Sequence, residues 1–177
     1  AALRDAVAIV GDDLLRELAG LSRAINPELA SELTFSSADT ESPAYQILRD
    51  QFTAFGRVVP NRGIYTIQRR DGTYRFGPEN YPAMDPLAST PGTVYEEPPP
   101  VLDQVFASAT PLAVGPYTDE FGTFVSAFAP VFDPHNGQVL MVVGLDMMAD
   151  AWKHTVHDGR RGPWAWIGFT ALLAILG

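Results

Sequence analysis

Apolar residues near the start of the chain recur at helical spacing. They follow one another at intervals of three or four residues, which places them along one stripe of an α-helix. The stripe consists of Leu3, Val7, Val10, Leu14, Leu18, Leu21 and Ile25. The pattern predicts a long amphipathic helix over residues 3–25 that ends or bends at Asn26-Pro27. Gly11 and Gly20 each weaken such a helix by up to about 1 kcal/mol relative to alanine.

A second helix is predicted after a polar connector over residues 31–40. Ser42 is a suitable N-cap, and Pro43 suits the first helical position, where its missing N–H costs no hydrogen bond. The helix should end at Gly56. Its apolar stripe is interpreted as part of the core and contains Tyr45, Leu48, Phe52 and Phe55.

Five segments rich in β-branched and aromatic residues predict strands. They lie near residues 64–69, 73–77, 112–118, 123–132 and 138–147. Short turn signals lie between neighbouring segments, namely Asp71-Gly72, residues 119–122 and Asn136-Gly137. Because tight turns join antiparallel strands, the fold class is predicted to be α+β with a five-stranded antiparallel sheet.

Both faces of the last hairpin are apolar, so the sheet needs a covering layer on each side. Ala127 and Ala129 are small enough to let the N-terminal helix approach one face closely. Phe124, Ser126 and Phe128 occupy the opposite face, where we expect a cavity. The proline-rich segment over residues 77–100 is too long for an idle connection and is predicted to roof that cavity. A short helix between Leu102 and Ala109 should follow it.

Composition indicates one globular domain and excludes several partners. The chain has 177 residues, of which 46% are hydrophobic and 19% charged. Its formal net charge of -9 argues against binding to nucleic acid or to anionic lipid. The absence of cysteine excludes disulfides and thiolate metal sites. We predict no cofactor and no metal site.

The C-terminal end differs from the rest of the chain. Residues 164–177 contain no charged residue, and Trp164 and Trp166 suit a membrane interface. We interpret this run as the start of a truncated transmembrane helix, although a buried terminal helix is the alternative, since a crossing needs roughly 20 residues. Residues 157–163 would form a juxtamembrane linker. A short helix over residues 149–156 would connect it to the sheet, which makes residues 1–156 one domain.

The ordered set of segments resembles the Cache sensor family, the PAS-like extracytoplasmic domains of bacterial membrane receptors. The resemblance rests on the N-terminal helix and on the apolar segment after the last strand. It also rests on the segments YTIQRRDGTYRF, PGTVYEEPP, PYTDEFGTFVSAFAPVFD and the GLD that closes the last strand. The resemblance implies a PAS-like sheet, with the long helix on one face and a ligand-pocket loop region on the other. It also implies a small-molecule sensor in the periplasm or outside the cell, attached to the inner membrane. Such domains feed a histidine kinase of a two-component system, a diguanylate cyclase or a chemoreceptor.

The resemblance also implies ligand-binding groups. Amine- and amino-acid-binding members hold the ligand ammonium with a Tyr-x-Asp and a Gly-x-Asp, which Tyr117, Asp119, Gly144 and Asp146 match here. The companion Arg-x-Trp-Tyr that grips a ligand carboxylate is not found, which leaves an amine or a different compound open beside an amino-acid-like ligand. The candidate ligand-binding residues are Tyr65, Arg69, Tyr74, Phe76, Tyr95, Tyr117, Asp119, Ser126, Phe128 and Asp146.

Simpler interpretations of the same residues stay open. Asp119 can cap its own turn, and Asp146 can bond backbone N–H groups at the end of its strand. A shift of one residue in the last hairpin would move Asp146 from the Ser126 side to the Ala127 side.

Two other functions are alternatives to a ligand sensor. The first is a ligand-free homodimer held by the N-terminal stripe. The second is an enzyme that uses Asp119 with Asp146 or a histidine. No Gly-x-Ser-x-Gly, His-Glu-x-x-His or phosphate-binding loop occurs, so we do not predict an enzyme for this segment.

Overall fold

A five-stranded antiparallel sheet forms the centre of the computed structural model, which describes residues 2–59 and 61–148 and, within α1, only the side chains from residue 11 onward. The strands are β1 (Gly63–Arg70), β2 (Thr73–Glu79), β3 (Leu112–Asp119), β4 (Gly122–Phe132) and β5 (Val139–Met148). Their order in the sheet is β2-β1-β5-β4-β3, and every neighbouring pair is antiparallel. The predicted fold class and all five strands are confirmed.

The three helices predicted within the described residues are confirmed, and the structure adds two short ones, α2 (Pro27–Glu32) and the 3-10 helix η1 (Ser37–Glu41). The other three are α1 (Ala2–Ala24), α3 (Pro43–Gly56) and α4 (Val101–Ser108). Asn26 ends the long helix and caps α2, because its side chain accepts a hydrogen bond from the Glu28 N–H. Ser42 is the N-cap of α3 as predicted, although its side chain makes no capping hydrogen bond.

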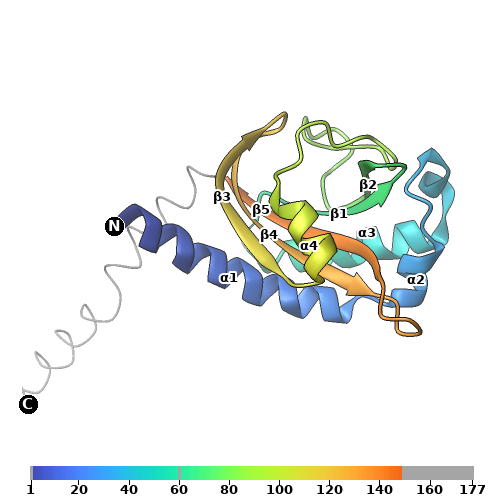
Figure 1. The fold of residues 1–177 in the computed structure, drawn as a ribbon. Coiled ribbons are helices and arrows are strands. Elements are labelled where there is room, and N and C mark those ends of the chain that lie inside the picture. The colour runs from blue at the N-terminus through green and yellow to red at the C-terminus, as the bar shows by residue number, and fades with distance from the viewer. Residues whose placement is uncertain (1, 60, 149–177) are drawn as a thin grey trace, which may run out of the picture.

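The two faces of the sheet are covered by different layers (Figure 1). The apolar stripe of α1, from Leu14 to Ile25, packs against the Val125, Ala127 and Ala129 side of β4. Leu102 and Val105 of α4 pack on the opposite face with Phe128. The helix stripe is therefore a core face over this part of its length, and the predicted assignment of faces is confirmed.

The predicted polar connector over residues 31–40 is wrong. Phe35 is fully buried in the core beside α3, and the segment forms helical turns. The cause is Asp39, a buried carboxylate that accepts hydrogen bonds from the backbone N–H groups of Thr34 and Phe35 and from the Thr34 hydroxyl. These bonds satisfy a tight turn in which Phe35 has a φ of 52°.

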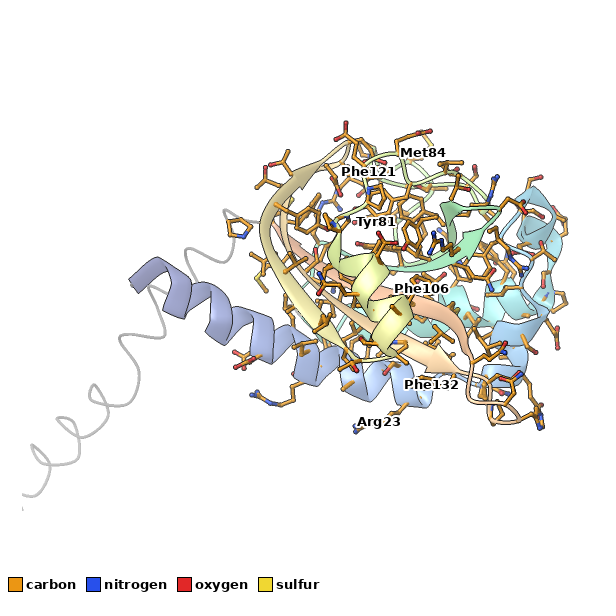
Figure 2. The ribbon with its side chains drawn as sticks, viewed as in Figure 1. Arg23, Tyr81, Met84, Phe106, Phe121 and Phe132 are labelled. Atoms are coloured by element: carbon orange, nitrogen blue, oxygen red, sulfur yellow. The ribbon has the colours of Figure 1, made fainter. Side chains whose placement is uncertain are left out.

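The second strand is longer than predicted. It continues through Pro78 to Glu79, where the sequence suggested a loop from Gly77 onward. Because β2 is an edge strand, the missing N–H of Pro78 need not break the sheet. The remaining residues 80–100, called the proline-rich loop below, lie over the face opposite α1, with Met84 at the exposed outer tip (Figure 2).

The C-terminal predictions lie outside the described residues. These are the helix over 149–156, the linker over 157–163 and the membrane segment over 164–177. Within residues 2–59 and 61–148, no helix combines the length and the apolar character that a membrane crossing requires.

The two glycines of α1 yield a matched test of how the helix lies on the sheet. A Cβ atom at Gly20 would meet nothing within 4 Å, so Gly20→Ala should raise the free energy of unfolding by about 0.5 to 1 kcal/mol. A Cβ at Gly11 would lie 3.1 Å from Ala113 Cβ on β3. Gly11→Ala should therefore lose part or all of that gain, which denaturant unfolding of the two variants would measure. Equal gains would contradict the close contact between α1 and β3.

Candidate functional site

Asp146 lies at the centre of a buried polar network. On the sheet it pairs with Ser126 of β4 and with Gly63 of β1, so the register on the Ser126 side is the one that occurs. Its Oδ1 accepts hydrogen bonds from the Tyr65 hydroxyl at 2.9 Å and from Ser126 Oγ at 2.6 Å. The suggestion that Asp146 bonds backbone N–H groups is therefore wrong. Within the described residues its Oδ2 accepts no hydrogen bond.

The glycine two residues before Asp146 makes room for the tyrosine donor. Tyr65 pairs with Gly144 on the neighbouring strand. A Cβ at Gly144 would lie 2.7 Å from the Tyr65 ring, which is far closer than carbon atoms approach without a shift. The absence of a side chain lets the ring lie flat over β5, so that its hydroxyl reaches Asp146.

Asp119 joins the β3–β4 turn to the proline-rich loop. Its Oδ1 accepts hydrogen bonds from the backbone N–H groups of Phe121 at 2.9 Å and Gly122 at 3.1 Å, so it does cap its own turn as one interpretation proposed. Its Oδ2 accepts a hydrogen bond from the Tyr95 hydroxyl. Nearby, the Tyr117 hydroxyl lies 3.0 Å from Ser126 Oγ, which links it indirectly to Asp146.

Glu79 is a third buried carboxylate on the same face. It pairs with Tyr65 at the end of β2, and only 1% of its surface is exposed. Its Oε1 accepts a hydrogen bond from the Ser89 N–H at 2.9 Å. Its Oε2 is buried and has no hydrogen-bond partner within the described residues.

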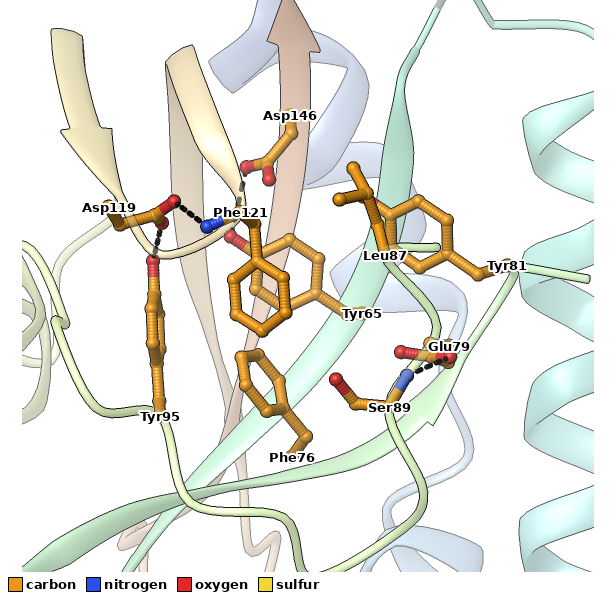
Figure 3. A pocket seen from close by; sticks show the side chains of 10 residues that line it. All are labelled: Tyr65, Phe76, Glu79, Tyr81, Leu87, Ser89, Tyr95, Asp119, Phe121 and Asp146. Atoms are coloured by element: carbon orange, nitrogen blue, oxygen red, sulfur yellow. Dashed lines mark hydrogen bonds between the residues drawn. The ribbon is translucent and has the colours of Figure 1, made fainter. Parts of the chain in front are cut away.

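These carboxylates line one small cavity between the sheet and the proline-rich loop (Figure 3). Its volume is about 20 Å³, which is room for about one water molecule. Five of its lining residues are aromatic and three are acidic, and within the described residues no arginine, lysine or histidine lines it. The lining residues are Tyr65, Phe76, Glu79, Tyr81, Leu87, Ser89, Tyr95, Asp119, Phe121 and Asp146. Larger hollows of about 380 to 540 Å³ are surface grooves without buried carboxylates.

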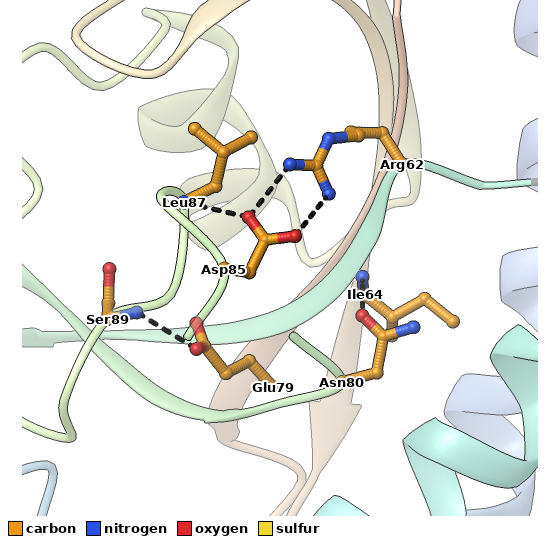
Figure 4. Close-up of polar contacts among 7 residues, drawn as sticks. All are labelled: Arg62, Ile64, Glu79, Asn80, Asp85, Leu87 and Ser89. Atoms are coloured by element: carbon orange, nitrogen blue, oxygen red, sulfur yellow. Dashed lines mark hydrogen bonds and ion pairs between the residues drawn. The ribbon is translucent and has the colours of Figure 1, made fainter. Parts of the chain in front are cut away.

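An ion pair fastens the proline-rich loop to the sheet beside this cavity (Figure 4). Arg62, just before β1, donates two hydrogen bonds to the Asp85 carboxylate at 2.8 and 3.1 Å. The guanidinium also lies 5.2 Å from the centre of the Tyr81 ring. Arg62, the basic residue beside the cavity that could otherwise hold a ligand anion, is therefore already paired with Asp85.

Burial sets the electrostatics of the cavity. It raises the pKa of Asp146 to about 7, although the hydrogen bonds from Ser126 and Tyr65 act in the opposite direction. It likewise raises the pKa of Glu79 to about 7, against the lowering effect of the Ser89 N–H. Burial also raises the pKa of Tyr65 well above its usual value, so its hydroxyl is a donor at neutral pH. These two carboxylates are thus harder to ionise than exposed ones, and a positive charge beside them would favour the ionised form.

The structure brings together seven of the ten candidate residues from the sequence. Five line the cavity, namely Tyr65, Phe76, Tyr95, Asp119 and Asp146. Tyr117 and Ser126 belong to the hydrogen-bonded network next to it.

The other three candidates lie elsewhere. Tyr74 donates a 2.5 Å hydrogen bond to Asp103 of α4, and the half-exposed Arg69 lies over the Tyr74 ring. Phe128 is a fully buried core residue.

Sequence reasoning missed half of the lining. Tyr81, Leu87 and Ser89 lie in the proline-rich loop, which was expected to roof the cavity but carries no periodicity that tells which side chains turn inward. Phe121 sits in a two-residue turn, where no strand alternation tells which way its ring packs. Glu79 could have been found from the β1–β2 hairpin. If the second strand is continued past Pro78, Glu79 falls opposite Tyr65.

Comparison with known proteins adds a shared fold. No protein-family model matches the chain, and no curated protein matches it. Among solved structures, it is similar to the ligand-binding domain of the Campylobacter jejuni chemoreceptor Tlp3 in complex with L-valine, with 14% identity and a TM-score of 0.50 over 87% of this chain and 60% of that chain. This likeness shows that the two share a fold.

Two further structures match at lower TM-scores. The sensory domain of the same receptor with isoleucine bound is 14% identical, with a TM-score of 0.49 over 87% of this chain and 59% of that one. The ligand-binding domain of the Pseudomonas aeruginosa PAO1 amino acid chemoreceptor PctC in complex with GABA is 21% identical, with a TM-score of 0.45 over 88% and 66%. The chain therefore spans about three fifths of the Tlp3 domains that it matches.

The raised pKa values predict an unusual dependence of stability on pH. Asp146 and Glu79 have native pKa values above their unfolded ones, so their contribution is fully favourable below about pH 4 and is lost as pH rises to about 7. For Asp146 the loss is up to about 4 kcal/mol. Asp146→Asn keeps an oxygen for Tyr65 and Ser126 but does not titrate. Urea unfolding between pH 5 and pH 8 should therefore show a smaller loss of stability in this variant.

Asp71→Asn is the matched control, because Asn-Gly suits the same exposed turn as Asp-Gly and the substitution removes the same charge. The window from pH 5 to pH 8 also keeps the Asp85 carboxylate ionised, since its hydrogen bonds with Arg62 lower its pKa. If Asp146→Asn and Asp71→Asn show the same slope, the buried carboxylate is not the cause.

Proposed function

We propose that the chain is an extracytoplasmic sensor domain whose cavity binds a small cationic amine. The observation that carries the proposal is the make-up of the cavity, which combines three carboxylates with five aromatic rings and no basic side chain within the described residues. An ammonium group offers donors to carboxylate oxygens, and its charge is attracted to aromatic faces. Asp146 Oδ2, which accepts no hydrogen bond within the described residues, is the proposed acceptor.

The same groups disfavour a ligand carboxylate. Arg62 is paired with Asp85 through two hydrogen bonds, so it is not free to hold an anion without breaking that pair. A ligand carboxylate in the cavity would face Asp119, Asp146 and Glu79 instead. The domain of similar fold is complexed with L-valine. For this chain the residues support an amine without a carboxylate.

Binding requires the cavity to open. Small-molecule sites usually enclose some 300 to 1,000 Å³, whereas this one holds about 20 Å³. We infer that Phe121 and the proline-rich loop move outward to admit the ligand and then close over it. The earlier part of the loop is held by side-chain contacts, among them the Arg62–Asp85 pair and the Glu79–Ser89 hydrogen bond, which can break without disturbing the sheet.

The signalling role is part of the same proposal. Asp146 lies two residues before the described part of the chain ends, on the strand that leads toward the predicted membrane segment. Ligand contact with this residue would shift the equilibrium between open and closed states by the difference in affinity for the two. The inner-membrane location and the output through a histidine kinase, diguanylate cyclase or chemoreceptor belong to this proposal.

A second candidate is a ligand-free structural module that dimerises through α1. The small cavity volume favours it, because the domain's own side chains fill the space. The stripe residues Leu14, Leu18, Leu21 and Ile25 are buried in the core and are not available for such a contact. The first turns of α1, which extend past the sheet edge in Figure 1, are the part of the stripe left for it. Amine binding in the cavity would decide against this candidate.

Isothermal titration calorimetry with butylamine tests the proposed ligand class. Butylamine should bind at pH 8, whereas butanol and butyrate should not. Asp146→Asn should weaken binding roughly tenfold to a hundredfold, because a hydrogen bond to a charged group contributes about 1.5 to 3 kcal/mol. Binding to the native chain should also weaken between pH 8 and pH 5.5, since the pKa of Asp146 is about 7 and its protonated form cannot compensate an ammonium.

Asp71→Asn again provides the control and should bind butylamine as the native chain does, since this turn residue does not line the cavity. No heat of binding for any of a panel of alkylamines, or equal binding of butylamine and butyrate, would overturn the proposal and leave the structural module as the function.

A further inference from the structure

One acidic oxygen in the cavity has no explanation from the fold. Glu79 Oε2 is buried and unpartnered within the described residues, while the other oxygen of the same carboxylate is held by the Ser89 N–H. Leaving a buried polar atom unpaired costs about 1 to 3 kcal/mol, and more when it carries charge. Figure 3 shows the carboxylate directed into the cavity, which it lines together with Asp146. A donor brought by a ligand would satisfy it.

Glu79 and Asp146 stand at opposite ends of this cavity. Glu79 pairs with Tyr65, and Gly63, two residues earlier on β1, pairs with Asp146. The two carboxylates therefore lie on one face, two strands and two residues apart. With strands about 4.8 Å apart and residues about 3.3 Å apart along a strand, their Cα atoms are on the order of 12 Å apart. Their side chains shorten that gap to the length of a short carbon chain.

The wall between them is apolar and aromatic. The Tyr65 and Phe76 rings lie 5.7 Å apart edge to face, and Phe121 covers Phe76 at 5.6 Å. This surface suits methylene groups. Its two phenylalanine rings have no hydrogen-bond donor for Glu79 Oε2, and its one hydroxyl, that of Tyr65, donates to Asp146. The nearest arginines are committed elsewhere, because Arg49 donates to the Tyr81 carbonyl and Arg62 to Asp85.

We propose that the ligand is a short-chain diamine, with one ammonium held by Asp146, the other by Glu79, and the methylene chain against the aromatic wall. This inference rests on the proposed amine-binding function and adds the second charge. A single ammonium at Asp146 would leave Glu79 Oε2 unpaired, whereas a dication compensates both carboxylates.

A comparison of 1,4-diaminobutane with butylamine isolates the second ammonium. Calorimetry at pH 8 should show the diamine binding to the native chain roughly tenfold to a hundredfold more tightly than butylamine. In Glu79→Gln, which preserves an oxygen for the Ser89 N–H, the diamine should lose most of that advantage, and butylamine should be affected far less. Asp146→Asn should weaken both ligands.

A second variant, which keeps the charge of residue 79, tests the diamine proposal by a change of preference between two ligands rather than by a loss of binding. Glu79→Asp shortens the side chain by one methylene and keeps the carboxylate. It should move the preference from 1,4-diaminobutane toward 1,5-diaminopentane, because the two anchors are then farther apart.

The outcomes separate the two proposals. If butylamine binds through Asp146 and the diamine binds no more tightly, the diamine inference is wrong and the amine sensor stands. If Glu79→Gln weakens the binding of both ligands equally, the diamine inference is also wrong, because Glu79 would then act on the cavity as a whole. If neither ligand binds the native chain, the proposed function itself fails.

Discussion

The buried carboxylate of Asp146 constrains the three strands around it. A carboxyl group inside a protein needs hydrogen-bond donors, and here β1 supplies Tyr65 and β4 supplies Ser126 to a single oxygen. Both faces of β4 are apolar, so the hydrophobic pattern alone specifies the register of the β4–β5 hairpin weakly. A slip of one residue would turn Asp146 into the apolar layer beneath α1 and remove the acceptor of the Tyr65 and Ser126 hydroxyls. The polar network therefore fixes a register that the apolar residues do not.

This register divides the molecule into two unlike halves. On the helix side, Ala127 and Ala129 let α1 lie close to the sheet, and the contact is apolar throughout. On the other side, carboxylates and tyrosines occupy the sheet surface, and a proline-rich loop without regular structure covers them. Local opening is easiest where few apolar contacts hold a segment, so the loop side is where a ligand can enter without unfolding the core.

Local patterns in the sequence were sufficient for the sheet and most helices, because the strand segments are rich in β-branched and aromatic residues and two of the three hairpin turns carry Asp-Gly or Asn-Gly. Asp119 and Asp146 were found through the family resemblance, and the local pattern alone left the register that turns Asp146 toward Ser126 open. Local patterns failed where one side chain reorganises an irregular segment, as Asp39 does when it turns Phe35 into the core. Glu79 was missed for a related reason, since only the sheet order shows that β2 is an edge strand able to continue through Pro78.

The proline-rich loop is attached unequally along its length. Its later part is bound to β2 through the backbone, where the Tyr95 N–H donates to the Tyr74 carbonyl and the Phe76 N–H to the Thr93 carbonyl. Its earlier part depends on side chains, among them Glu79, whose Oε1 holds the Ser89 N–H. Ionisation of Glu79 strengthens that hydrogen bond, and a ligand ammonium at Oε2 favours ionisation. Ligand charge and closure of this part of the loop would therefore reinforce each other through one carboxylate, which is the coupling that a sensor requires.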